Sequence, residues 1–376
     1  MKKNGFTIVE LVVVIAVIAV LAAVLIPTFA TLIKKANRSA DTQNLRNMNT
    51  LLAIEKAEGG EVSLSDAIKA VYNGGYDLMT KDADHRYAFN KTKCEFEYVE
   101  NTASLGADYE TMTEVTTLDS LETSVENGGI VYLKGSYDLN DSTEKKYLHV
   151  KSDLVVVGDS SNLTVPNDAK DTSGIAFWSD QTSPLFVVVN DDVTITLCGL
   201  NLNGTSSSNS LVATAANNTT INLFDCTLND SCYGINIRNY GDPANNLLSS
   251  GNTITEDATV NVYIKNCNIN ANLSAFNFKY VGGTVTVEDS VLSQKKTGDY
   301  ALIANEGNGV KMTFKNCTLN AAGEDIISTQ YGAKNTTVIF EGCTDNGKNY
   351  AIALSGSGPA GIGNKIIKDG TTVASN

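Results

Sequence analysis

The sequence is poor in the residues that metal sites and nucleic-acid-binding surfaces use. Its 376 residues include only 2 His, and no two of its 7 Cys are separated by just two residues. Histidine and closely spaced cysteine are the usual ligands of structural zinc, so we expect no metal site. Lys and Arg number 28 against 42 Asp and Glu, a net charge of -14. A nucleic-acid partner requires a basic surface that replaces condensed counterions, and we expect no such partner.

An apolar segment lies at the N-terminus of this otherwise polar chain. It covers residues 6–29, which is long enough to cross a ~30 Å hydrocarbon layer as a helix. Glu10 is its one charged residue. A secretory signal peptide would end in a small-residue cleavage site after the apolar core, and none follows here. Helical periodicity continues to Glu58, with an expected bend at Pro27 because proline removes a backbone donor.

The first 60 residues or so resemble the precursors of type IV pilins and pseudopilins. The features shared with that family are Lys2, Lys3, Gly5, Phe6, Thr7, Glu10, the apolar run and Pro27. The resemblance implies that a prepilin peptidase cuts the Gly5–Phe6 bond on the cytoplasmic side and that Phe6 is then N-methylated. It also implies a single-pass membrane protein with its leader in the cytoplasm and its head outside the cell, in the membrane or in a surface pilus.

Glu10 is the residue expected to act in assembly. A carboxylate inside a membrane segment costs several kcal/mol unless it is paired. After cleavage, the α-amine of Phe6 would lie one helical turn from Glu10, and a neighbouring subunit's amine could neutralise the acid. Two interpretations stay open, namely pairing with other pilin subunits through the N-terminal helix and a simple position at the lipid headgroups. The cleavage motif favours the first.

A small folded unit is expected after the long helix. Ser63 and Asp66 predict a capped helix over 64–73, and alternating apolar residues predict a β-hairpin over 86–100. We expect His85 to lie on the surface at the edge of this hairpin. The predicted organisation is a leader at 1–5, the transmembrane part of the pilin helix at 6–29, the rest of that helix with the short helix and hairpin at 30–100, a linker at 101–116 and a parallel β-helix with an N-terminal capping helix at 117–376.

Six segments in the C-terminal two-thirds share one pattern of two apolar residues, a polar turn and a fixed position. They cover residues 195–202, 221–228, 262–269, 285–292, 312–319 and 338–345. The fixed positions are Leu200, Cys226, Cys267, Ser290, Cys317 and Cys343, at steps of 26, 41, 23, 27 and 26 residues. Such a period is typical of the coils of a parallel β-helix. We expect these residues to stack in an internal ladder, with the cysteines packed as small apolar side chains. A Cys226–Cys232 disulfide stays open.

Residues 116–141 and 148–165 resemble the entry to pectate-lyase-like right-handed β-helices, in which a helix caps the open end of the core. The fold class expected is therefore mixed. It consists of a long N-terminal transmembrane α-helix with a small α+β pilin-like unit, followed by an all-β right-handed parallel β-helix.

Lyases of the pectate-lyase type use an arginine base and acidic calcium ligands, whereas the hydrolases group aspartates with basic residues. Beyond the hairpin this chain has one arginine, Arg238, and one histidine, His149. We therefore expect no catalytic residues, no cofactor and no enzyme. Arg238, Tyr240 and Asp242, beside a Pro/Asn/Gly/Ser-rich inserted loop, are the expected ligand-binding face.

The function expected is a pilin-like or pseudopilin subunit whose β-helix head serves adhesion or surface binding, with a minor or tip position favoured by its bulk. Its expected partners are the prepilin peptidase and methylase, other pilin subunits, the membrane and a surface or carbohydrate ligand. The alternative is a membrane-tethered polysaccharide lyase or glycoside hydrolase that uses the pilin segment as an anchor.

Overall fold

The computed structural model describes residues 8–139, 148–164, 184–204, 210–214, 216–238, 259–279, 282–297, 300–353 and 359–376. The chain divides into two compact units, which we call the helical unit (Met1–Thr111) and the β-rich unit (Met112–Asn376). The boundary falls within 101–116, where we expected a linker. That segment holds two short strands, β3 (Tyr109–Glu110) and β4 (Thr113–Val115), one in each unit.

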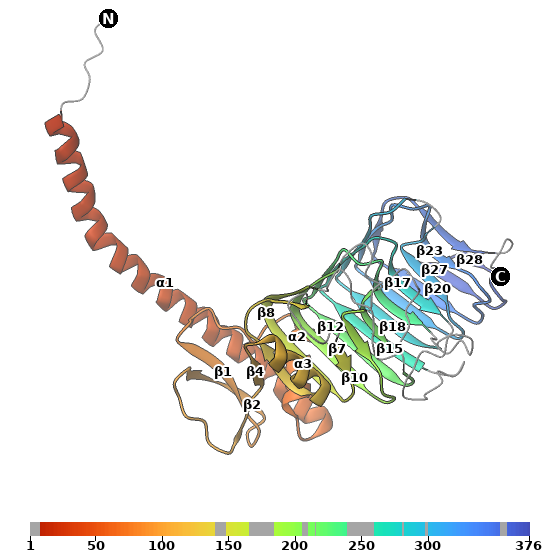
Figure 1. Ribbon diagram of the computed structural model, residues 1–376, viewed down its shortest axis with the longest axis horizontal. Coiled ribbons are helices and arrows are strands. Elements are labelled where there is room, and N and C mark those ends of the chain that lie inside the picture. The colour runs from red at the N-terminus through yellow and green to blue at the C-terminus, as the bar shows by residue number, and fades with distance from the viewer. Residues whose placement is uncertain are drawn as a thin grey trace, which may run out of the picture. The chain divides into compact units, whose positions relative to one another are not determined.

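Helix α1 (Ile8–Gly59) dominates the helical unit and runs through Pro27 without a break. Figure 1 shows it as one gently curved helix. The Thr31 hydroxyl donates a 2.9 Å hydrogen bond to the carbonyl of Pro27, one turn earlier. Helix α2 (Leu64–Asn73) has the predicted limits, because the Ser63 side chain accepts the N–H of Asp66 and caps its first turn.

The predicted β-hairpin is also present, formed by β1 (His85–Asn90) and β2 (Glu95–Glu100), with β3 antiparallel to β1. Residues of α1, α2 and the hairpin share one core. Met48, Leu52 and Ile68 are fully buried, and the rings of Phe89 and Phe96 lie 5.3 Å apart across the hairpin. The second half of α1 is thus a packed helix, whereas its first half is not.

Parallel strands in three rows make up the β-rich unit, and the chain visits the rows in turn (Figure 1). Row 1 contains β4, β5 (Gly129–Leu133), β8 (Leu154–Thr164), β10 (Thr194–Asn203), β12 (Thr219–Phe224), β15 (Thr259–Lys265), β18 (Gly282–Glu288), β21 (Lys311–Lys315), β24 (Thr337–Glu341) and β27 (Lys365–Lys368), and ends in the antiparallel β28 (Thr371–Ser375). Row 2 contains β6 (Tyr137–Asp138), the second halves of β8 and β10, β13 (Thr227–Asn229), β16 (Asn268–Ala271), β19 (Val291–Gln294), β22 (Thr318–Asn320) and β25 (Thr344–Asp345). Row 3 contains β7 (Leu148–Val150), β9 (Phe186–Val188), β11 (Ser210–Thr214), β14 (Tyr233–Arg238), β17 (Ser274–Lys279), β20 (Ile303–Glu306), β23 (Asp325–Thr329) and β26 (Asn349–Ile352).

The register of row 1 confirms the alignment of the six repeated segments. The first apolar residue of each segment pairs with that of the next, in the order Ile195, Ile221, Val262, Val285, Met312 and Val338. The step of 41 residues leaves this register intact, because the additional residues lie between β14 and β15. Equivalent side chains therefore stack, as the repeat predicts.

A tight turn joins row 1 to row 2 in each repeat. The residue before each fixed position has a positive φ, and these residues are Gly199, Asp225, Asn266, Asp289, Asn316 and Gly342. Gly, Asn and Asp adopt this left-handed conformation most readily, which explains the polar turn of the repeat. Neighbouring turns are also bonded to each other, since the Asn316 amide donates to the Asp289 carboxylate at 3.1 Å.

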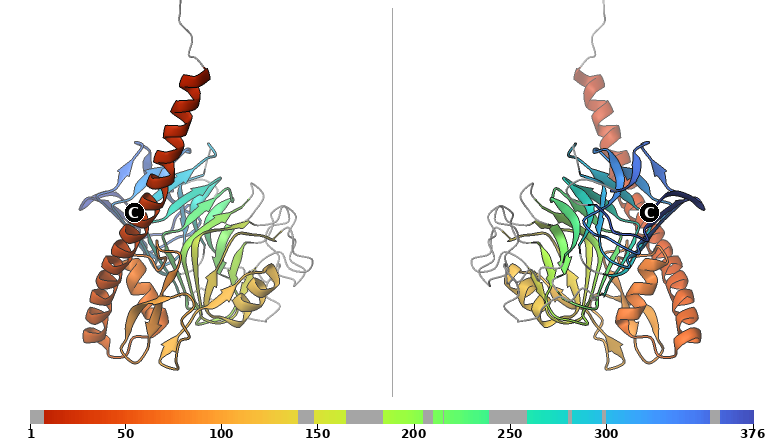
Figure 2. Two further views of the ribbon diagram at one scale, coloured as in Figure 1. Left: turned by 90° about the vertical axis from the view of Figure 1, so that its left-hand side faces the viewer. Right: turned by 90° about the vertical axis from the view of Figure 1, so that its right-hand side faces the viewer.

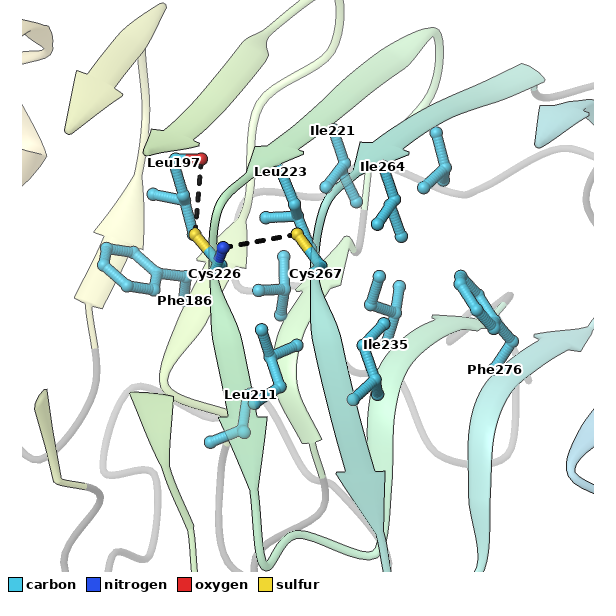
Figure 3. Close-up of a cluster of buried hydrophobic side chains, with 14 of the residues drawn as sticks. Phe186, Leu197, Leu211, Ile221, Leu223, Cys226, Ile235, Ile264, Cys267 and Phe276 are labelled. Atoms are coloured by element: carbon cyan, nitrogen blue, oxygen red, sulfur yellow. Dashed lines mark hydrogen bonds between the residues drawn. The ribbon is translucent and has the colours of Figure 1, made fainter. Parts of the chain in front are cut away.

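The fixed positions form the expected internal ladder. The backbone N–H of Cys226 donates to Sγ of Cys267 at 3.3 Å, and that of Cys267 donates to Oγ of Ser290 at 3.0 Å. Figure 3 shows Cys226 and Cys267 among the buried aliphatic side chains around them. All seven cysteines are free, so Cys226 and Cys232 are not bridged.

Aromatic rings continue the core toward the C-terminus. Figure 2 shows the strands of the β-rich unit from two further sides. The rings of Phe314 and Phe340 stack at 5.0 Å. At the other end, α3 (Leu118–Asn127) packs against β7 and buries Leu121 and Val125 completely. This helix thus covers the first strands, as a cap must.

Candidate functional site

The first half of α1 is the most unusual surface of the described chain. An 18-residue window of this helix has a mean hydropathy of 3.2 and no part of it is buried. Ile8 is 82% exposed, and Val20 and Ile26 are each 67% exposed. A soluble domain does not leave so long an apolar surface in water, and the helix is long and apolar enough to cross a membrane.

Glu10 lies in the first turn of α1, on this exposed part of the helix. A negative charge near a helix N-terminus is favoured by the positive end of the helix dipole. The predicted processing residues Gly5 and Phe6 lie outside the described residues. The structure therefore describes the expected assembly residue, whereas the expected cleavage site is known from the sequence alone.

A buried carboxylate fastens the second half of α1 to the loop before the hairpin. Asp41 is 2% exposed and accepts the backbone N–H groups of Lys81 at 2.8 Å and Asp82 at 2.9 Å. The Tyr98 hydroxyl donates to the same carboxylate at 3.1 Å. Burial raises the pKa of the Tyr98 phenol, and the neighbouring carboxylate raises it further by disfavouring the phenolate. Asp41 thus receives three hydrogen bonds in a site that excludes water.

A second carboxylate extends this network. Asp82 is 4% exposed and accepts a 2.6 Å hydrogen bond from Nε of Arg38. That bond lowers the pKa of Asp82 and raises the pKa of Arg38. The expectation that His85 is a surface residue is wrong, since its side chain is only 14% exposed, its Nδ1 lies 3.1 Å from Asp82, and its ring stacks on Tyr98 at 4.6 Å. These contacts come from α1, the loop and both hairpin strands, and they join α1 to the hairpin.

The ligand face expected in the β-rich unit is only partly described. Arg238 is the last residue of β14, and its Cα pairs with that of Lys279, which pairs in turn with Glu306. Tyr240 and Asp242 lie outside the described residues. The backbone therefore brings Arg238 into register with a lysine and an acid.

Aspartates in the described turns serve the backbone. Asp192, Asp225 and Asp230 have positive φ values of 60°, 52° and 65°. Asp191 accepts the backbone N–H of Asn217 at 2.7 Å. These are turn conformations, which Asp adopts readily. Among the described residues, no group of three or more His, Cys, Asp or Glu is arranged to hold a metal ion.

The comparison with protein families supports the interpretation of the N-terminal segment as prepilin-type. Residues 1–26 match the family model described as the prokaryotic N-terminal methylation motif. No curated protein matches the chain, and no solved structure matches it. The matched segment contains Gly5, Phe6 and Glu10 and most of the exposed apolar helix. The chain therefore carries a prepilin-type segment. This segment supports the interpretation of the chain as a pilin-like precursor that is anchored in a membrane, processed by prepilin peptidase and assembled with other pilin subunits.

Proposed function

We propose that the protein is a type IV pilin-like or pseudopilin subunit that displays a right-handed parallel β-helix outside the cell. The observation that carries this proposal is the coincidence of two features in one segment. The methylation motif covers residues 1–26, and the helix segment that follows the motif's cleavage position is apolar and has no buried residue in its 18-residue window. A membrane anchor alone would require the second feature and not the first.

Processing would proceed at the Gly5–Phe6 bond, with N-methylation of Phe6. The new N-terminus would lie one turn before Glu10, within reach of an acid on a neighbouring helix. Pairing of that amine with Glu10 would cancel two charges that are costly in lipid, and would set the axial stagger between subunits. The hydrogen bonds to Asp41 support this role, because they join the helix that carries the assembly segment to the rest of the helical unit.

The β-rich unit would be the displayed head, acting by adhesion or surface binding and not by catalysis. Three rows of stacked parallel strands with a helix at the first end support a β-helix, since each coil can bury its apolar side chains only against its neighbours. Asp192, Asp225 and Asp230 in its turns have the left-handed backbone conformation that Asp adopts readily, which gives them a structural reason that requires no catalysis. The face around Arg238 is the proposed position of the ligand.

The test is intact-mass analysis of the full chain produced together with a type IV prepilin peptidase and methylase. We expect loss of residues 1–5 and gain of one methyl group, about 14 Da. Gly5→Ala should remain unprocessed, whereas Asn4→Ala, one residue away, should be cut normally. An uncut wild-type chain would show that residues 6–29 are only an anchor and would overturn the proposal.

A further inference from the structure

Cys317 and Cys343 lie directly next to each other on adjacent coils. Thr318 in β22 pairs with Thr344 in β25, and Lys315 pairs with Glu341, so the two cysteines are at equivalent positions between these pairs. Adjacent parallel strands are about 4.8 Å apart, which is within the Cα separation that disulfides span. The backbone register therefore satisfies the first requirement for a bridge.

Both thiols point the same way, into the interior of the stack. Sγ of Cys317 lies 3.4 Å from the carbonyl oxygen of Val287, and Sγ of Cys343 lies 3.3 Å from the carbonyl oxygen of Phe314. Val287 and Phe314 are themselves paired across β18 and β21. The two side chains thus repeat one geometry a single coil apart.

The two cysteines differ in access to solvent. Cys317 is 1% exposed, whereas Cys343 is only partly buried. Strand β25 is the last strand of row 2 in the described part of the chain. The turn between β27 and β28 follows on this side, and its Asp369 accepts the backbone N–H of Gly342 at 2.9 Å. A hydrogen bond from Cys317 lowers the pKa of the Cys343 thiol to about 7, and the same bond and burial raise the pKa of Cys317. Near neutral pH, Cys343 is thus the thiol that reacts first, because the thiolate is the nucleophile.

We propose that Cys317 and Cys343 are a modification site, which a small-molecule disulfide such as oxidised glutathione converts to a disulfide linking the last two coils that have strands in all three rows. The Cys343 thiolate attacks one sulfur of the small disulfide and releases one thiolate, leaving a mixed disulfide on Cys343. Cys317 then loses its proton and attacks the Cys343 sulfur, which releases the second small thiol. Two cysteine thiols are oxidised, and one small disulfide is reduced to two thiols.

The ladder contains a second stacked pair that serves as an internal control. Cys226 and Cys267 have the same relation, since Thr227 pairs with Asn268. They are 1% and 3% exposed, and burial raises the pKa of Cys267 well above its ordinary value. Cys226 and Cys267 thus have the register of the proposed pair but are closed to solvent. We therefore expect them to stay reduced in the folded protein. On the proposed function the head lies outside the cell, where disulfides form and persist.

The test uses the full, unprocessed chain in detergent, reduced and then incubated with oxidised glutathione. Remaining thiols are blocked with N-ethylmaleimide, and the protein is digested with trypsin without reduction. We expect one new species joining peptides 316–334 and 335–348, each of which holds a single cysteine. The linked pair should weigh about 2 Da less than the two reduced peptides together.

Cys317→Ser and Cys343→Ser should each abolish this species, and Cys226→Ser should leave it unchanged. Serine is a sound replacement, because Ser290 occupies the equivalent position on another coil with its hydroxyl bonded in the same way. A lasting glutathione adduct on Cys343, a link to another cysteine, or a fully reduced pair would each overturn the proposal. The result does not depend on leader cleavage, so failure here leaves the pilin proposal standing, and the reverse also holds.

Discussion

Replacement of Asp41 by Asn tests whether the buried carboxylate fastens the loop before the hairpin to α1. In the wild type, one carboxylate oxygen accepts the N–H of Lys81 and the other accepts the N–H of Asp82 and the Tyr98 hydroxyl. Asparagine keeps one acceptor oxygen and places an NH₂ group where the other oxygen was. At least one donor then faces another donor in a site that is almost closed to water.

The magnitude follows from these contacts. A hydrogen bond to a charged group contributes about 1.5–3 kcal/mol, and a buried donor without an acceptor costs about 1–3 kcal/mol. We therefore expect Asp41→Asn to reduce the free energy of local opening of the loop by about 2–4 kcal/mol. Since 1.4 kcal/mol corresponds to a factor of ten, amide exchange at Lys81 and Asp82 should accelerate roughly 30- to 1000-fold.

Hydrogen–deuterium exchange followed by mass spectrometry, on the full chain in detergent, measures this opening directly. Asp84→Asn is the matched control, because Asp84 is 58% exposed and its ion pair with Lys34 lies at the surface. Exposed ion pairs contribute about 0–1 kcal/mol, so this variant should exchange within about fivefold of the wild type. Equal acceleration in both variants, or none in Asp41→Asn, would refute the reasoning.

Three further predictions concern assembly, packing and pH. Glu10→Gln should be processed normally but should lower filament assembly at least roughly tenfold, since no charge then pairs with the processed N-terminus; immunoblots of sheared surface fractions measure this. Phe314→Ala should destabilise the β-rich unit by about 3–5 kcal/mol in chemical denaturation, because its fully buried ring stacks on Phe340. A hydrogen bond from Lys368 lowers the pKa of Asp345 to about 2. Because this folded-state pKa lies below the unfolded value, the carboxylate stabilises the fold above about pH 4, and this contribution is lost as pH falls toward 2. The denaturation midpoint of Asp345→Asn should therefore change less between pH 4 and pH 2 than that of the wild type.

The local elements and the strand register could be predicted because their causes lie close together in sequence. Ser63 and Asp66 define the start of α2, and the repeated apolar pattern defines which residues pair across row 1. The positive-φ turns also had a signal, since Asn, Asp or Gly precedes each fixed position. That signal was visible in the sequence only as a generic polar turn.

The network around Asp41 could not be predicted, because it depends on contacts between residues about 40 to 57 positions apart. Asp41 lies in a polar stretch of α1 and looks like a solvent-facing residue. His85 was placed on the surface for the same reason, since neither Asp82 nor Tyr98 forms a recognisable motif with it. Strands β3 and β4 are only 2 and 3 residues long, too short to show an alternating pattern in a segment that reads as a linker.

The direction of the hydrogen bonds in the β-rich unit has a mechanical consequence. The bonds between paired strands join one coil to the next, so they run along the stack and not around it. A pull along the stack would load these bonds in series, and each coil would tear from its neighbour at the force that one interface withstands. The outermost interface has the fewest neighbours, and rupture should begin there. A covalent link between Cys317 and Cys343 would leave the outermost interface, between β24 and β27, free to open, but it would stop the rupture at the next interface.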